Sequence, residues 1–216
     1  MQTTTTTTYL DRVLPAIDLV ADRFVTMVTG APDPTVRVPS TPAWTVRDVA
    51  AHLVTVTVRY AAGPEGRGVW TRTPMDLPGL NHDQLAALGI ATVGELAARL
   101  RRELTALRAQ VQGYGTDLPS YRFHGGERVR ADIALGILLG ELVVHGWDVA
   151  RATGQAYEVD AASLEAVHGF VAQFSEPGQE EARAGLFGPV VEVPEDAPLL
   201  DRVIGLTGRD PASSPG

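Results

Sequence analysis

The sequence predicts an all-α protein, in which a four-helix bundle with long loops carries a short C-terminal extension. Apolar residues recur at helical spacing in four long segments, expected at about residues 10–28, 45–60, 92–113 and 132–154. Thr45–Asp48 and Thr92–Glu95 have the pattern of a capping box, in which a threonine precedes an acidic residue by three positions. The sequence has no internal repeat and no glycine-rich phosphate loop that would indicate another architecture.

Irregular segments separate these helices. Residues 1–8, with six consecutive threonines, are expected to be a flexible lead. After the first helix stops at Gly30, a proline-rich segment at residues 31–42 should cross the surface. Long loops are expected at residues 63–90, as a lid or substrate wall, and at residues 114–130.

The C-terminal part has a different character. A further helix at about residues 160–175 should complete the main domain, residues 9–175. Residues 176–209 are expected to form an extension packed on the bundle, with a short strand at 190–193 and a helix at 198–207. Residues 210–216 should be flexible.

The composition limits the possible classes of function. The chain has 216 residues, 44% of them hydrophobic and 20% charged, as in a globular protein with a sizeable core. A net charge of −8 argues against binding to nucleic acid, because phosphate neutralisation supplies most non-specific affinity. The N-terminus lacks the pattern of a secretory signal, and no apolar run has the length of a membrane span. We therefore expect a cytoplasmic protein that binds neither nucleic acid nor membranes.

Glu141, His145 and Asp148 follow one another at spacings of four and three in the apolar segment 138–154. A helix would place all three on one face, which also carries apolar residues and should point toward the core. An unpaired carboxylate is unfavourable there, and a bound metal ion would remove that cost. Glutamate and histidine one helical turn apart can reach a single divalent cation.

The second predicted helix carries His52 on an apolar face with Val49 and Leu53. Alone, such a histidine is typical of a core residue bonded to a backbone carbonyl, but beside an inward-facing Glu141 and His145 it could be a metal ligand. Since the chain contains no cysteine, a metal would have to use histidine and carboxylate. Two histidines and one carboxylate leave open positions, which suits zinc, ferrous iron or nickel. A buried polar network without metal is the remaining alternative.

The other histidines are less informative. His82 is interpreted as a solvated loop residue and His168 as a structural one. His124 is a candidate for proton handling at the site, with a surface position as the alternative.

Asp148 is expected either to orient His145 or His52 by accepting a hydrogen bond, or to pair with Arg47 or Arg151. Trp44 and Trp147 are expected to be core aromatic residues near the site.

Two segments carry a family resemblance. The first is Trp44–Leu53, WTVRDVAAHL, and the second, about 90 residues later, is Glu141–Ala150, ELVVHGWDVA. In this order they resemble the actinobacterial metal-binding branch of the DinB-like superfamily, which includes the N-terminal domain of mycothiol-dependent maleylpyruvate isomerase. The resemblance covers most of residues 9–175.

The resemblance implies a DinB-like bundle with one divalent metal ion, commonly zinc, held by His52, Glu141, His145 and water. It also implies that the metal activates a low-molecular-weight thiol such as mycothiol, which fits a chain without cysteine. The isomerase has a further C-terminal domain that completes its active site, and the roughly 40 residues after the bundle here are too few for that domain. Maleylpyruvate is therefore not the expected substrate.

These observations lead to two functional hypotheses. The first is a metal-dependent transferase or isomerase that joins a small-molecule thiol to a small electrophile. The second is a non-catalytic protein in which the metal stabilises a binding or interaction surface. The chain is expected to be a monomer or a homodimer.

Overall fold

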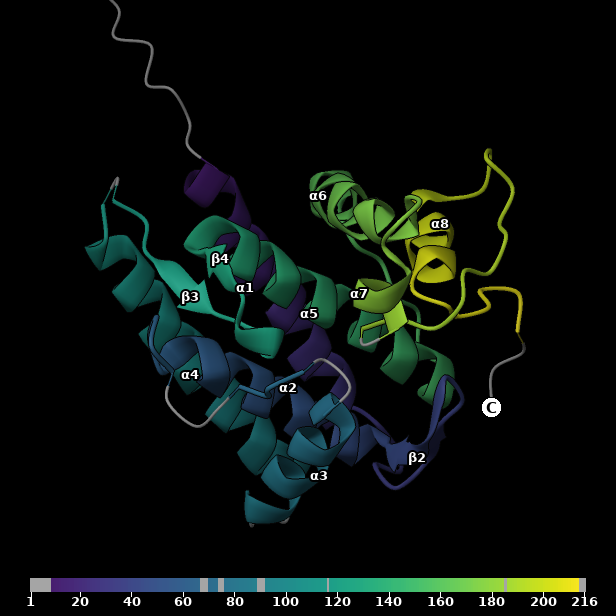
Figure 1. Cartoon of the computed structure of the whole chain (residues 1–216). Helices are drawn as coiled ribbons and strands as arrows, with labels where there is room; N and C mark the ends of the chain where they lie inside the picture. Colours follow the sequence, from purple (N-terminus) through teal and green to yellow (C-terminus); the bar gives the residue numbers. More distant parts are fainter. Residues whose placement is uncertain are drawn as a thin grey trace, which may run out of the picture.

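The computed structural model describes residues 9–66, 70–73, 76–88, 92–115, 117–184 and 186–213. Its core is a bundle of long helices: α1 (Tyr9–Thr29), α2 (Val46–Ala61), α4 (Val93–Gly113) and α5 (Ala131–Thr153). Helix α1 packs along α5, α2 packs along α4, and α2 also contacts α5 (Figure 1). The prediction of an all-α bundle is confirmed.

Helix α5 is the centre of this bundle. It is apolar around most of its circumference, and it ends at Gly154, whose φ of 68° is a left-handed conformation that glycine adopts without strain. Its length and composition would allow it to cross a membrane, but 78% of its most apolar window is buried inside the protein. This burial is typical of a core helix.

Both predicted capping boxes are present. The side chain of Thr45 accepts a hydrogen bond from the backbone of Asp48, whose carboxylate accepts one from the backbone of Thr45 in return. Thr92 and Glu95 make the same reciprocal pair at the start of α4. Each box satisfies two N–H groups that a helix N-terminus leaves unpaired, which fixes where α2 and α4 begin.

Short elements occur where only loops were expected. The proline-rich segment folds into a hairpin of β1 (Arg37–Val38) and β2 (Thr41–Thr45). The stretch 63–90 contains a helix, α3 (Leu77–Ala87), of which Asn81 is the buried residue. The loop at 114–130 is a second hairpin, β3 (Ser120–Arg122) and β4 (Arg128–Arg130), around a 3₁₀ turn, η2 (His124–Gly126). The loop interpretation of these segments was wrong because none has enough buried positions to produce a periodic pattern.

The C-terminal elements group together on one side of the bundle (Figure 1). They are α6 (Ala161–Ala172), η3 (Gln173–Ser175), α7 (Glu180–Ala184) and α8 (Leu199–Leu206). Helix α8 packs on α6, and its Ile204 is buried with Val144 and Trp147 of α5. The predicted strand at 190–193 is wrong. The backbone N–H of Val191 donates to Gly205 of α8, so this segment runs along a helix instead of pairing with another strand.

Of the two termini expected to be flexible, residues 1–8 and 214–216 lie outside the described residues. Residues 210–213 form a turn, in which the backbone N–H of Ala212 donates to the carboxylate of Asp210.

Gly146 provides a test of packing around α5. A Cβ atom at this position would lie 2.6 Å from Cζ of Tyr157, whose hydroxyl donates to the carbonyl of Val143. We expect Gly146→Ala to lower the free energy of unfolding by about 1–3 kcal/mol through overpacking. Gly169→Ala in α6, where a Cβ meets no atom within 4 Å, should raise it by about 0.5–1 kcal/mol. Urea unfolding of both variants checks this, and equal effects of the two substitutions would contradict it.

Candidate metal centre and its cavity

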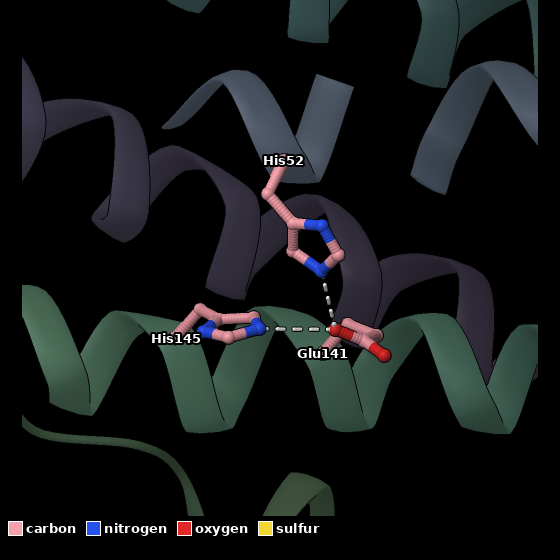
Figure 2. A group of neighbouring side chains, drawn as sticks. All are labelled: His52, Glu141 and His145. Carbon is pink, nitrogen blue, oxygen red and sulfur yellow. Dashed lines mark hydrogen bonds and ion pairs between the residues drawn. The ribbon is translucent and has the colours of Figure 1, made fainter. Parts of the chain in front are cut away.

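Three potential ligands from two helices meet in the core. His52 comes from α2, and Glu141 and His145 come from α5, one helical turn apart (Figure 2). Oε2 of Glu141 lies 3.3 Å from Nε2 of His52 and 3.2 Å from Nε2 of His145. One ligand atom from each residue lies within 4.8 Å of the others. Helical spacing places Glu141 and His145 together, and the packing of α2 on α5 brings His52 to them.

The electrostatics of the three groups are coupled. Burial lowers the pKa of His52 to about 4, although Glu141 acts in the opposite direction. Burial also opposes the charged form of His145, but hydrogen bonds to Asp148 and Glu141 outweigh it and raise the pKa of His145 to about 9. For Glu141 burial favours the neutral acid, yet hydrogen bonds from His145 and His52 hold its pKa well below the usual range. Glu141 is thus an anion between two imidazoles.

Asp148 is fully buried and accepts hydrogen bonds from three directions. Its Oδ2 lies 2.8 Å from Nδ1 of His145, so that Nε2 of His145 is turned toward Glu141. Ser40 donates to its Oδ1 at 2.5 Å. Arg209 of the C-terminal extension makes a two-point ion pair with it, at 2.7 Å and 2.9 Å. Burial would raise the pKa of Asp148, but Arg209 and His145 lower it strongly. The ion-pair partner is therefore Arg209, not the expected Arg47 or Arg151.

A cavity of about 580 Å³ opens beside these residues. His52, Glu141 and His145 line one part of it, together with Trp44, whose ring centroid lies 4.8 Å from that of His52. Its walls are largely apolar and include Ile133, Ile137, Phe123, Phe170, Phe174 and Phe187. Leu77, Pro78 and Asn81 of α3 also line it, so the stretch expected to be a lid or substrate wall contributes a helix to the lining of the cavity. A chamber of this size and character suits a small organic ligand.

The remaining three histidines lie in different environments. His124 lines the cavity and is only 5% exposed, so the surface interpretation of it was wrong. It is held by Thr71, whose backbone N–H and hydroxyl lie 3.2 Å and 2.7 Å from Nδ1. His82 is exposed, although on α3 and not in a loop. His168 of α6 lies 3.5 Å from Arg202, and is not among the cavity residues.

Arg209 and Asn81 are two polar cavity residues that the sequence analysis did not identify. Arg209 follows a short helix near the C-terminus, and Asn81 lies on a helix with no apolar stripe. Neither residue stands in a periodic pattern or beside another polar residue of the site. No local signal in the sequence could have assigned them.

Residues 15–150, more than half of the chain, match the family described as the mycothiol maleylpyruvate isomerase N-terminal domain. The chain belongs to this family. The resemblance inferred from the segments at Trp44–Leu53 and Glu141–Ala150 is confirmed.

Two further comparisons give matches over most of the chain. Uncharacterized proteins from two strains of Mycobacterium tuberculosis are 25% identical over 171 residues, covering 77% of this chain and 80% of theirs. The crystal structure of the mycothiol-dependent maleylpyruvate isomerase matches with a TM-score of 0.55 and 14% identity, over 77% of this chain and 71% of that chain. At this identity the match shows that the fold is shared.

The Asp148–Arg209 pair should contribute measurably to stability, because Asp148 is fully buried and Arg209 mostly so. A double-mutant cycle of Asp148→Asn and Arg209→Gln, read by urea unfolding, should give a coupling energy of about 1–3 kcal/mol. The exposed pair Asp22–Arg101, 3.4 Å apart, is the control and should couple by less than about 0.5 kcal/mol. Equal coupling in the two cycles would show that Arg209 does not hold the extension to α5.

His124 should make stability depend on pH. Burial, with a smaller effect of Arg59, lowers its pKa to about 4, whereas an unfolded histidine has a pKa near 6.5. Between pH 4 and 6.5 the unfolded chain therefore binds more protons at His124 than the folded chain does. The stability that the neutral, buried His124 contributes is complete above pH 6.5 and is lost as pH falls toward 4. Between pH 6.5 and 4, the free energy of unfolding of His124→Gln should therefore fall by about 2 kcal/mol less than that of the wild type.

Urea unfolding at pH 7, 5.5 and 4.5 measures this difference. His82→Gln, at an exposed position, is the matched control and should follow the wild-type profile. A His124→Gln profile that coincides with that of the wild type would contradict the prediction.

Proposed function

We propose that this family member binds one divalent metal ion through His52, Glu141 and His145 and uses it in a reaction between a low-molecular-weight thiol and a small electrophile. The observation that carries the proposal is the convergence of two imidazole Nε2 atoms on one carboxylate oxygen, at 3.3 Å and 3.2 Å, beside a cavity. Two histidines and a carboxylate are a common donor set for catalytic zinc, and nickel or ferrous iron also accept it. Zinc is our first choice.

The surroundings of the three residues fit this role. Asp148 accepts from Nδ1 of His145 and so leaves Nε2 free to act as a ligand, the arrangement often found behind metal-bound histidines. Nδ1 of His52 is buried and has no partner among the described residues, so His52 lacks a comparable support. Glu141, anionic and with 31% of its side chain exposed, faces the cavity where a ligand could enter.

A metal bound here would supply a Lewis acid that stabilises a thiolate near neutral pH. The chain has no cysteine, so the thiol has to come from outside, and the family name points to mycothiol or a similar thiol. In a transfer, a sulfur–carbon bond forms and the thiol proton passes to the leaving group or to the carbon skeleton. In an isomerisation, the same bond later breaks and the thiol is regenerated. The apolar walls would hold the electrophile and exclude water.

The alternative function is that of a non-catalytic binding protein stabilised by metal. It is favoured by the fact that the three side chains join α2 to α5, so that an ion would cross-link two core helices. A cytoplasmic location and a monomeric or homodimeric state stay predictions.

The test of the metal site is elemental analysis of the purified native protein. We expect about one metal ion per chain, and a sharp decrease in His52→Ala and Glu141→Ala. His82→Ala removes an exposed histidine and should keep the wild-type content. A wild-type protein that holds no metal, even after reconstitution with zinc, nickel or ferrous iron, would overturn the proposal.

The catalytic and non-catalytic functions are separated by thiol binding. Mycothiol added to the cobalt-substituted protein should produce a thiolate-to-cobalt absorption band, and S-methylated mycothiol should not. If metal removal lowers Tm strongly but mycothiol produces no band, the non-catalytic function is favoured.

A further inference from the structure

Two buried polar side chains line the cavity in addition to the proposed metal ligands and have unused hydrogen-bond donors. They are His124, in the turn η2, and Asn81, on α3. The first is 5% exposed and the second 8%. Neither residue is used by the site described above. The orientation of each is fixed by a neighbour that can only donate, which determines what each presents to the cavity.

Thr71 fixes the tautomer of His124. Its backbone N–H lies 3.2 Å from Nδ1 and can only donate, so Nδ1 must accept. In the neutral imidazole the hydrogen is then on Nε2. This Nε2–H has no partner within the part of the chain that the structure describes. His124 therefore offers the cavity a hydrogen-bond donor.

Arg59 orients Asn81 in the same way. Its Nη2 donates to Oδ1 of Asn81, and since a guanidinium has no acceptor, the amide oxygen has to face it. The amide NH₂ group is then turned away from Arg59, and no described residue accepts from it. Asn81 thus adds a second donor to the lining of the cavity.

The charge of Arg59 reinforces this arrangement. Arg59 is 3% exposed, and among the described residues it bonds only to amide oxygens, those of Asn81 and Gln84. Its positive charge is not cancelled by an adjacent carboxylate, although Glu141 lies close enough to raise its pKa. It also acts to lower the pKa of His124, which Glu141 acts to raise. The positive charge of Arg59, which is bonded directly to Asn81, favours an electron-rich oxygen in front of the amide donor.

The other arginines that line the cavity are already engaged. Arg209 is paired with Asp148, and Arg128, about half exposed, is paired with Glu65. A ligand oxygen that enters this part of the cavity would meet free donors at His124 and Asn81 in particular.

We infer that Nε2–H of His124 and the amide NH₂ of Asn81 form a subsite for an acceptor-only oxygen, a carbonyl or a carboxylate, of the ligand that fills the apolar part of the cavity. The inference rests on the proposed function in one respect, which is that the ligand is taken to be the electrophile of the proposed reaction. Fixed donors without a protein partner discriminate strongly, because a ligand that lacks the oxygen leaves them buried and unpaired.

Three probes of similar shape test the subsite. They are 4-phenylbut-3-en-2-one, with a neutral carbonyl, cinnamate, with a carboxylate, and 1-phenylbut-1-ene, with no acceptor. Dissociation constants are measured by NMR titration of the full chain, without thiol and without turnover. The wild type should bind the ketone, the carboxylate or both about tenfold more tightly than the hydrocarbon.

The variants separate the donors from the shape of the cavity. Asn81→Asp keeps the acceptor that Arg59 uses but removes the NH₂ group, and His124→Phe removes the ring N–H. Each should abolish most of the advantage of the oxygenated probes and leave hydrocarbon binding unchanged. His124→Gln can accept from Thr71 and donate to the cavity, and should restore much of the advantage. Asn81→Asp is a near-isostere, so it tests the proposal even if His124→Phe folds poorly.

The outcomes are distinct. A loss confined to cinnamate in His124→Phe, which adds no charge, identifies a carboxylate as the occupant. A loss confined to the ketone identifies a carbonyl. Equal weakening of all three probes, or no advantage of oxygenated probes in the wild type, overturns the subsite. Because the assay needs no thiol and no turnover, its failure would leave the metal-content and thiol-band experiments intact.

Discussion

The carboxylates of Glu141, which is partly buried, and Asp148, which is fully buried, constrain the rest of this structure. Both lie on α5, the most apolar helix of the bundle, where an unpaired anion would cost several kcal/mol. Glu141 is stabilised by His52 and His145, and Asp148 by His145, Ser40 and Arg209. These partners come from α2, from the chain between β1 and β2, and from the C-terminal extension. Satisfying two anions therefore draws three separate parts of the chain onto one helix.

This arrangement gives the C-terminal extension a role beyond covering the core. Arg209 neutralises Asp148, and Asp148 in turn holds the ring of His145, so the extension reaches a proposed metal ligand through two contacts. The same extension contributes Phe187 to the wall of the cavity. Two residues that follow α6 thus supply part of the cavity wall, through Phe187, and the counter-charge of Asp148, through Arg209.

The sequence predicted those features that depend on local patterns. The long helices follow from apolar spacing, the starts of α2 and α4 from their capping boxes, and the inward position of His145 from its spacing to Glu141. Features that depend on distant partners were missed. His124 was misplaced because it is held by Thr71, which is 53 residues away. Arg209 was not identified because its partner is 61 residues away. Residues 190–193 have the apolar pattern of a strand, but the backbone of Val191 donates to Gly205 of α8 and not to another strand.

Together, the two proposals assign different chemistry to two parts of the cavity. One end carries an anionic carboxylate between two imidazoles, an environment that attracts a cation and, through it, a thiolate. Another part presents the N–H donors of His124 and of Asn81, which is bonded to Arg59, and these favour an electron-rich oxygen. A conjugated electrophile whose oxygen lies at the donors would have its electrons drawn toward them, which leaves its far carbon electron-poor. If the apolar walls hold that carbon toward the metal ligands, binding alone would orient it for attack by sulfur.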